Sequence, residues 1–111
     1  MTFVIVFSER AEEEIDDIFF WMLGHSPNSA DTWLRGLHET IDALREIPTR
    51  CTIARENILF DTAVRQILHG KYRILFSLID ADGDERFDTV RILHVRHGAR
   101  RDIGEVTETS D

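Results

Sequence analysis

The sequence has one cysteine, two prolines, one lysine and no long apolar run. Because a single Cys51 cannot form an internal disulfide, the composition favours a reducing compartment, and we expect a cytoplasmic protein. No stretch approaches the roughly 18 apolar residues that cross a membrane. The apolar run at residues 2–7 is too short for a secretory signal and lacks a basic segment before it. A disulfide scaffold and a membrane partner are therefore not expected.

Positive charge is also scarce, since 13 Lys and Arg face 21 Asp and Glu and give a formal net charge of −8. Broad, non-specific nucleic-acid binding needs a basic surface, so this balance argues against it. Residues 1–49 carry 3 − 10 = −7, whereas residues 50–111 carry 10 − 11 = −1. Residues 89–101 contain four arginines and no acidic residue. A basic segment therefore lies near the end of an acidic chain.

The first half of the chain predicts one strand and two helices. Residues 2–7 are β-branched and aromatic, which is typical of a strand. Ser8 is a good helix N-cap, an apolar stripe of helical period follows, and Gly24 ends it. Ser26 with the following proline starts a second helix, whose stripe continues until Pro48. The short connection predicts an antiparallel helical hairpin, with Trp21, Trp33 and Phe19 in the core.

The second half changes to a period of two. Strands are predicted at 64–69, 72–79 and 87–96, with a tight turn at Gly70-Lys71 and a polar turn at 80–85. Strict alternation gathers Tyr72, Ile74, Phe76 and Leu78 on one face, and Val90, Ile92 and His94 on one face of the last strand. Residues 49–63 show no clear period, so a loop with some local structure is expected.

Helices and strands are segregated along the chain, which predicts an α+β fold. The expected architecture is a strand, an antiparallel two-helix hairpin and then a three-stranded antiparallel meander, with the helices packed on one face of the sheet. Residues 1–101 form the single predicted domain, because 111 residues suffice for one core. Residues 102–111 are acidic and polar, and we expect a frayed tail.

Two motifs suggest metal sites and are better explained otherwise. The run from Asp80 to Glu85 has some likeness to a calcium loop, but its glycine falls too early, so a hairpin turn is expected. His94 and His97 are three apart on a strand and point to opposite faces, so they do not share one metal. No metal and no cofactor are predicted, and the surroundings of Cys51 do not resemble those of a nucleophile.

The strongest constellation is basic. Arg73 lies on the middle strand of the meander, and Arg96, His97, Arg100 and Arg101 lie at or beyond the end of the last strand. Adjacent antiparallel strands bring such residues to one rim, where guanidinium groups could hold phosphates or carboxylates bidentately. The alternative is that Arg73 makes an internal salt bridge and the others are solvated surface.

The same residues resemble the RelE/ParE toxin superfamily. Its members commonly show a G-x-Y-R strand, here Gly70-Lys71-Tyr72-Arg73, and a V-x-H-G-x-R-like close, here within residues 90–101. The front of the chain agrees, because a short strand enters a helix at Ser8 and a second helix starts with an S-P-x-x-A pattern at Ser26. The resemblance covers roughly residues 3–101.

The resemblance implies the toxin of a type II toxin–antitoxin pair, a class that includes plasmid stabilisation systems. Such a toxin inhibits growth, is neutralised by a cognate antitoxin and does not bind specific DNA sequences alone. ParE-like members are associated with poisoning DNA gyrase, whereas RelE-like members cut messenger RNA on the ribosome. Arg73 matches the arginine of the family's Y-R strand. The basic position after the last strand is matched by Arg100 or Arg101, and less well by Arg96.

Two departures favour the ParE-like branch. The strand at 64–68 carries one basic residue where nuclease members tend to have several, and the tail at 102–106 has no Tyr or Phe. Metal-independent RNA cleavage needs proton transfer, for which arginine is a poor base. A nuclease built on Arg73, Arg100 and His97, with His97 or His94 moving the proton, remains the alternative.

The antitoxin is expected to cover exposed strand edges or the helical hairpin, where its basic residues could meet the acidic first helix.

Overall fold

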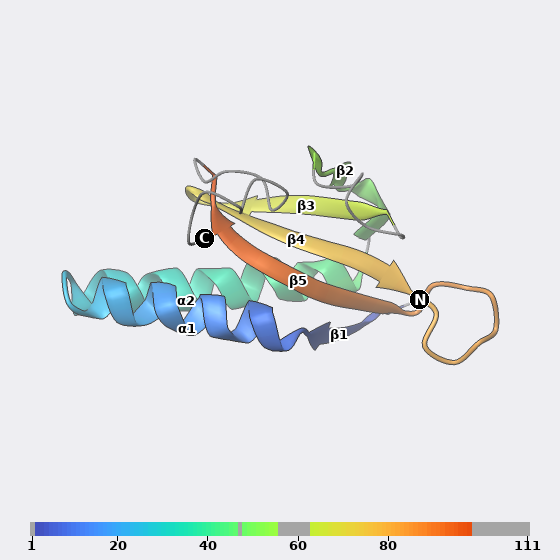
Figure 1. Cartoon of the computed structure of the whole chain (residues 1–111), viewed down its shortest axis with the longest axis horizontal. Helices are drawn as coiled ribbons and strands as arrows, with labels where there is room; N and C mark the ends of the chain where they lie inside the picture. Colours follow the sequence, from blue (N-terminus) through green and yellow to red (C-terminus); the bar gives the residue numbers. More distant parts are fainter. Residues whose placement is uncertain (1, 47, 56–62, 99–111) are drawn as a thin grey trace, which may run out of the picture.

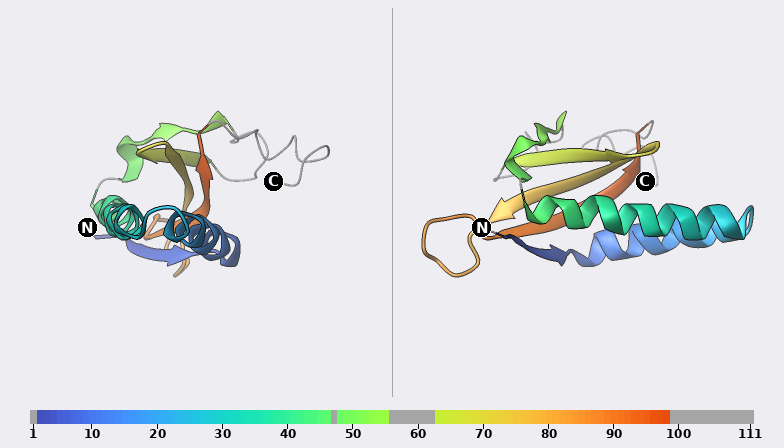
Figure 2. Two further views of the ribbon diagram at one scale, coloured as in Figure 1. Left: turned by 90° about the vertical axis from the view of Figure 1, so that its left-hand side faces the viewer. Right: turned by 180° about the vertical axis from the view of Figure 1, so that it is seen from behind.

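A computed structural model describes residues 2–46, 48–55 and 63–98, and Figure 1 shows their arrangement. Two long helices lie side by side along one face of a curved sheet, which gives a helical layer and a sheet layer (Figures 1 and 2). The predicted α+β class, with the helices on one face of the sheet, is confirmed. In chain order the elements are β1 (Val4–Phe7), α1 (Glu9–Leu23), α2 (Pro27–Asp42), the 3-10 helices η1 (Ala43–Arg45) and η2 (Pro48–Arg50), β2 (Thr52–Ile53), β3 (Val64–His69), β4 (Tyr72–Ile79) and β5 (Thr89–His97).

Serine caps begin both long helices, as the sequence predicts. The hydroxyl oxygens of Ser8 and Ser26 each accept a backbone N–H of the first turn, at 3.0 and 3.4 Å. Gly24 caps the end of α1. The second helix ends earlier than predicted, at Asp42, because its last turn tightens into the 3-10 helix η1. None of the described helices is long and apolar enough to cross a membrane.

Five strands form one sheet in the order β1-β5-β4-β3-β2. The last three strands of the chain form the predicted antiparallel meander. At one edge β1 pairs with β5 in parallel, and at the other edge β2 pairs with β3. Residues 49–63, expected to be a loop with some local structure, contain the end of η2 and the strand β2 in their described part; β2 is too short to show a period and is fixed by its partner. Residues 56–62 lie outside the described part of the chain.

The main core lies between the helices and one face of the sheet. On the central strand β4 this face carries Ile74, Phe76 and Leu78, with Tyr72 partly buried beside them, as alternation predicts. Leu75 points to the other face and packs with Ala54 and Val64 in a second, smaller cluster. Both faces of β4 are therefore covered, and even its polar Ser77 is buried.

A one-residue bulge changes the alternation in β5. Phe76 pairs with Ile92, but the preceding Leu75 pairs with His94, so Leu93 is an extra residue on the β5 side. An extra residue reverses the two faces beyond it. Val95 therefore joins the main core, and the prediction that His94 shares a face with Ile92 is wrong.

The tip of the helical hairpin extends beyond the sheet (Figures 1 and 2). Trp33 is buried and Phe19 packs against the core, as predicted. Trp21 was also predicted in the core, but 61% of its surface is exposed. Phe20 beside it is 65% exposed, because this turn of α1 has passed the end of the sheet that would cover it.

Candidate functional site

Four of the residues singled out in the sequence meet at one end of the sheet. Because β4 and β5 run antiparallel, Arg73 is the register partner of Arg96, and Tyr72 is the register partner of His97. The pairing joins the Y-R strand to the part of the basic segment that ends β5. Arg100 and Arg101 lie outside the described residues.

Arg73 and Arg96 are buried, with 6% and 3% of their surfaces exposed. Alternation along β4 places Arg73 on the face of Leu75, away from the helices. Gly98 lies beside the Arg73 stem, because a Cβ built on this glycine would be 3.9 Å from Arg73 Cγ and Cδ. Antiparallel pairing brings Arg73 and Arg96 to one edge as expected, and both side chains are buried there, so the alternative of solvated surface is wrong for Arg96. Arg73 and Arg96 are thus register partners on one face of the sheet, and guanidinium groups are chemically suited to phosphate or carboxylate groups.

His97 lies on the other face of the sheet. Neighbouring residues of a strand point to opposite sides, so His97 and Arg96 are separated although adjacent in sequence. The His97 ring instead packs edge-on against Tyr72, with centroids 5.3 Å apart, and both line a groove beside α1. The structure thus brings Arg73 and Arg96 together but does not place His97 on their face.

An aromatic series continues from Tyr72 under the helices. Tyr72 packs edge-on against Trp33 at 5.3 Å, and Trp33 packs against His69 at 6.2 Å. Burial raises the pKa of the Tyr72 phenol above its ordinary value. His69 lies so close to α2 that a Cβ on Gly36 would be 2.6 Å from its ring. The sequence predicted Trp33 in the core but contained no pattern that linked it to residues of two other elements, β3 and β4.

His94, the second candidate for proton transfer, is held by Glu14 of α1. Its Nδ1 lies 3.1 Å from Glu14 Oε1, and the same oxygen accepts the backbone N–H of Val95 at 3.0 Å. Glu14 is 7% exposed, and Arg10 Nε lies 3.5 Å from its other oxygen. β1 ends at Phe7 and does not extend beside Val95. Glu14 therefore supplies the hydrogen-bond acceptor for the Val95 N–H that a longer neighbouring strand would otherwise provide. The sequence offered Glu14 only as one of several acidic residues in the first helical turns.

The acidic turn between β4 and β5 is organised by its own backbone. The carboxylate of Asp80 accepts the N–H groups of Gly83 and Glu85 at 2.8 and 2.7 Å, which is the hydrogen bonding of an Asx-type turn. Hydrogen bonds from the Thr89 hydroxyl and from a backbone N–H hold the pKa of Asp88 below its ordinary value. These contacts agree with the predicted hairpin turn.

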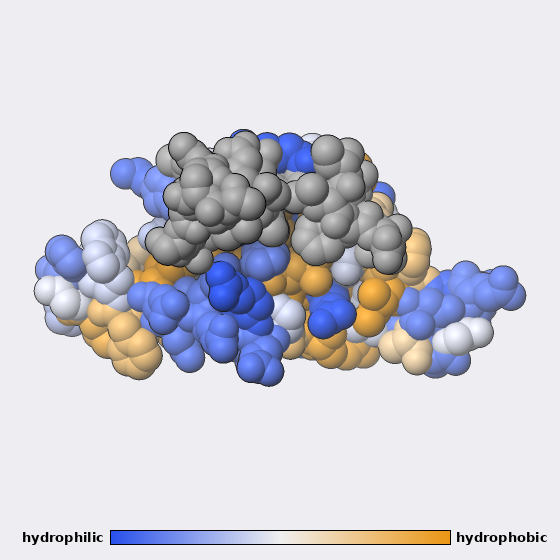
Figure 3. Space-filling model, viewed as in Figure 1, coloured by the Kyte–Doolittle hydropathy of each residue, from blue (hydrophilic) through white to orange (hydrophobic). Residues whose placement is uncertain are grey.

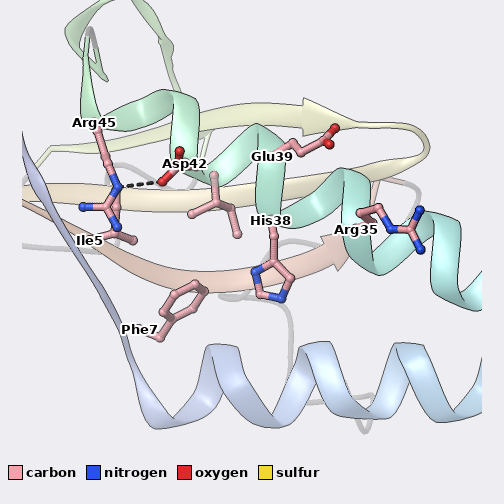
Figure 4. A pocket seen from close by; sticks show the side chains of 8 residues that line it. Ile5, Phe7, Arg35, His38, Glu39, Asp42 and Arg45 are labelled. Carbon is pink, nitrogen blue, oxygen red and sulfur yellow. Dashed lines mark hydrogen bonds and ion pairs between the residues drawn. The ribbon is translucent and has the colours of Figure 1, made fainter.

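A second groove, of about 440 Å³, lies between β1 and α2 (Figure 4). Ile5 and Phe7 form its apolar floor, and the side chains along the rim formed by α2 and η1 are polar or charged: Arg35, His38, Glu39, Asp42 and Arg45. The groove opens along an edge strand, where a further strand or helix could pack.

Cys51 shows no sign of activation. Burial raises the pKa of its thiol, and the nearby charge of Arg65 lowers it by less. The Arg65 guanidinium donates to the Cys51 carbonyl oxygen at 2.8 Å, so it supports the backbone of this segment.

Residues 5–102 match the family described as the ParE toxin of the type II toxin–antitoxin system, parDE. The fold is similar to that of the chromosomal ParDE system from P. aeruginosa, with a TM-score of 0.67, 12% identity, and 86% of this chain and 96% of that chain covered. It is also similar to the toxin–antitoxin complex RelBE2 from Mycobacterium tuberculosis, with a TM-score of 0.53, 22% identity, and 87% and 99% covered. Among curated proteins no sequence matches this chain.

At 12% and 22% identity, the similarity to these two solved structures shows a shared fold and nothing more. The family match covers almost the entire described chain and includes β1 from Ile5 onward, both helices and the Tyr72-Arg73 strand. The fold and the sequence motifs agree with it. The chain belongs to the ParE toxin family of type II toxin–antitoxin systems.

Proposed function

We propose that this toxin arrests growth by binding and poisoning DNA gyrase in the cytoplasm, and that a cognate antitoxin neutralises it. The observation that carries the choice of target is the separation of His97 from Arg73 and Arg96 on opposite faces of the sheet.

The reason lies in the chemistry of RNA cleavage. Without a metal, cleavage needs a group that moves a proton beside groups that stabilise the charge of the phosphorane. Arg73 and Arg96 suit the second task, but His97 lies on the opposite face, and His94, on their own face two residues before Arg96, is engaged by another element. His97 packs on Tyr72, and His94 is held by Glu14. The described residues therefore favour recognition over catalysis, which supports a toxin that acts through protein binding.

The charge of the molecule points the same way. A net charge of −8 opposes approach to ribosomal RNA, which is a polyanion. The family match supports the ParE branch, and its description names a toxin–antitoxin system. Both solved relatives are toxin–antitoxin systems, which supports an antitoxin partner for this chain.

The test is induction of the chain in a bacterial host, followed by two assays. Growth should stop, the DNA-damage response should rise, and purified gyrase should accumulate cleaved plasmid DNA when the toxin is added. Mapping of transcript ends tests the alternative, a RelE-like ribosome-dependent endoribonuclease. Cuts clustered within codons, together with unaffected gyrase, would refute the proposal.

Variants of the arginine pair sharpen the test. Arg96→Ala should abolish growth arrest, whereas Arg91→Ala, an exposed arginine on the same strand, should leave it unchanged. Because Arg96 is buried, Arg96→Lys and a thermal unfolding curve separate loss of the guanidinium from loss of the fold.

A further inference from the structure

A groove of about 440 Å³ separates α1 from the end of the sheet. Asp17 and Trp21 of α1 line it; they are one helical turn apart and so lie on the same side of the helix. Tyr72 of β4 and His97 of β5 line its other side. The groove therefore has aromatic walls and a carboxylate at its rim, with Ile18 completing the lining.

Trp21 is fixed in place although it is exposed. The His25 ring lies 4.4 Å from the Trp21 ring, and His25 Nδ1 lies 2.8 Å from the Trp21 carbonyl oxygen. His25 thus covers part of the indole and restrains it, while the indole still lines the groove. An aromatic side chain that is already ordered loses little conformational entropy when a partner packs on it.

The electrostatic surroundings of the groove are negative. Five acidic side chains of α1 are exposed: Glu9, Glu12, Glu13, Asp16 and Asp17. Arg10, the one basic residue in the α1 sequence, lies 3.5 Å from the buried Glu14. In Figure 3 the body of α1 presents a hydrophilic surface, and an apolar patch lies toward the tip of the hairpin. This surface repels anions and attracts cations.

We propose that the groove binds an arginine or lysine side chain of the antitoxin, seated between Trp21 and Tyr72 with its cationic group against Asp17. The inference rests on the proposed function, since it names the chemistry with which the antitoxin meets this toxin. Indole and phenol faces attract a cation, and a carboxylate at the same place adds a charge-assisted hydrogen bond. A phosphate or an acidic segment would be repelled by Asp17 and its neighbours on α1.

The test first identifies an antitoxin-like short reading frame beside the gene and then measures, by calorimetry, the affinity of the purified toxin for its product. Asp17→Asn and Trp21→Ala should each weaken binding about tenfold, the size expected for one charged contact with an aromatic wall. Asp16→Asn and Phe20→Ala are matched controls, because both residues are exposed on α1 and neither lines this groove. The controls should change the dissociation constant less than about threefold.

A double-mutant cycle identifies the guest side chain. Each Arg and Lys of the antitoxin is changed to Gln in turn, and one of these changes should lose its effect in the Asp17→Asn toxin. Equal affinities for all four toxin variants would overturn the inference and leave the toxin–antitoxin pairing intact. A wild-type toxin that neither binds the antitoxin nor arrests growth would instead refute the proposed function, and this inference with it.

Discussion

Replacing Glu14 tests whether a helix side chain completes the edge of the sheet. Its carboxylate is buried, accepts the N–H of the fully buried Val95 at 3.0 Å and lies 3.1 Å from His94 Nδ1. In Glu14→Ala the Val95 N–H loses its acceptor, and an unsatisfied buried donor costs about 1–3 kcal/mol. With the contact to His94 also lost, we expect a total destabilisation of about 2–3 kcal/mol.

Urea denaturation followed by circular dichroism measures this loss. For an m value of roughly 1–1.5 kcal/mol/M, the midpoint should fall by about 1.3–3 M. Glu14→Gln keeps an oxygen for the Val95 N–H and should cost less, about 1 kcal/mol. Hydrogen exchange of the Val95 amide should become faster in Glu14→Ala.

Glu13→Ala is the matched control, because it removes an exposed carboxylate from the same helix with the same change in helix propensity. Its free energy of unfolding should change by less than about 0.5 kcal/mol. If Glu14→Ala and Glu13→Ala prove equally stable, the edge of β5 does not depend on the carboxylate and the reasoning is wrong.

Three further predictions concern packing, capping and titration. Gly36→Ala should destabilise the fold by about 1–2 kcal/mol, because its Cβ would lie 2.6 Å from the His69 ring. In a His69→Ala background the same change should instead stabilise the helix by up to about 1 kcal/mol. Thermal unfolding of the variants measures both effects. Ser8→Ala should cost about 1 kcal/mol more than Ser26→Ala in urea, because the Ser8 hydroxyl also donates to a β5 carbonyl oxygen at 3.0 Å. Tyr72 is the single tyrosine, so absorbance at 295 nm should show its folded-state pKa above that of the unfolded chain. Because that pKa is raised, the stability it contributes is fully present below the unfolded value and is lost as pH rises through the folded one.

The parts of the fold that depend on local patterns could be predicted from the sequence. Caps at Ser8 and Ser26 and the glycine at the end of α1 depend on a few neighbouring residues, so they appear in the sequence. The meander has clear alternation and a short Gly70-Lys71 turn. β2 could not be predicted, because two residues carry no period and the strand exists through its pairing with β3.

Other features depend on contacts between distant segments. The bulge at Leu93 moves Val95 into the core. The sequence of β5 reads as a regular strand, so the bulge could not be predicted from it. Trp21 is a large aromatic residue of the kind that usually lies in the core. It is exposed because the hairpin is longer than the sheet it covers. The meeting of Arg73 and Arg96 followed from antiparallel pairing. Their burial could not be predicted, since it depends on what covers the face away from the helices.

The parallel pairing of β1 with β5 has a consequence for how the toxin is made. The Ser8 hydroxyl donates to the Leu93 carbonyl oxygen across 85 residues, and Glu14 contacts β5 from a similar separation. At about 5–20 residues per second, a ribosome needs roughly 4–17 s between those two points. Throughout that interval the first strand of the nascent chain lacks its partner and the core cannot close. The finished fold, and any toxicity that depends on it, therefore arises only near the end of translation, so incomplete chains should be harmless to the cell that makes them.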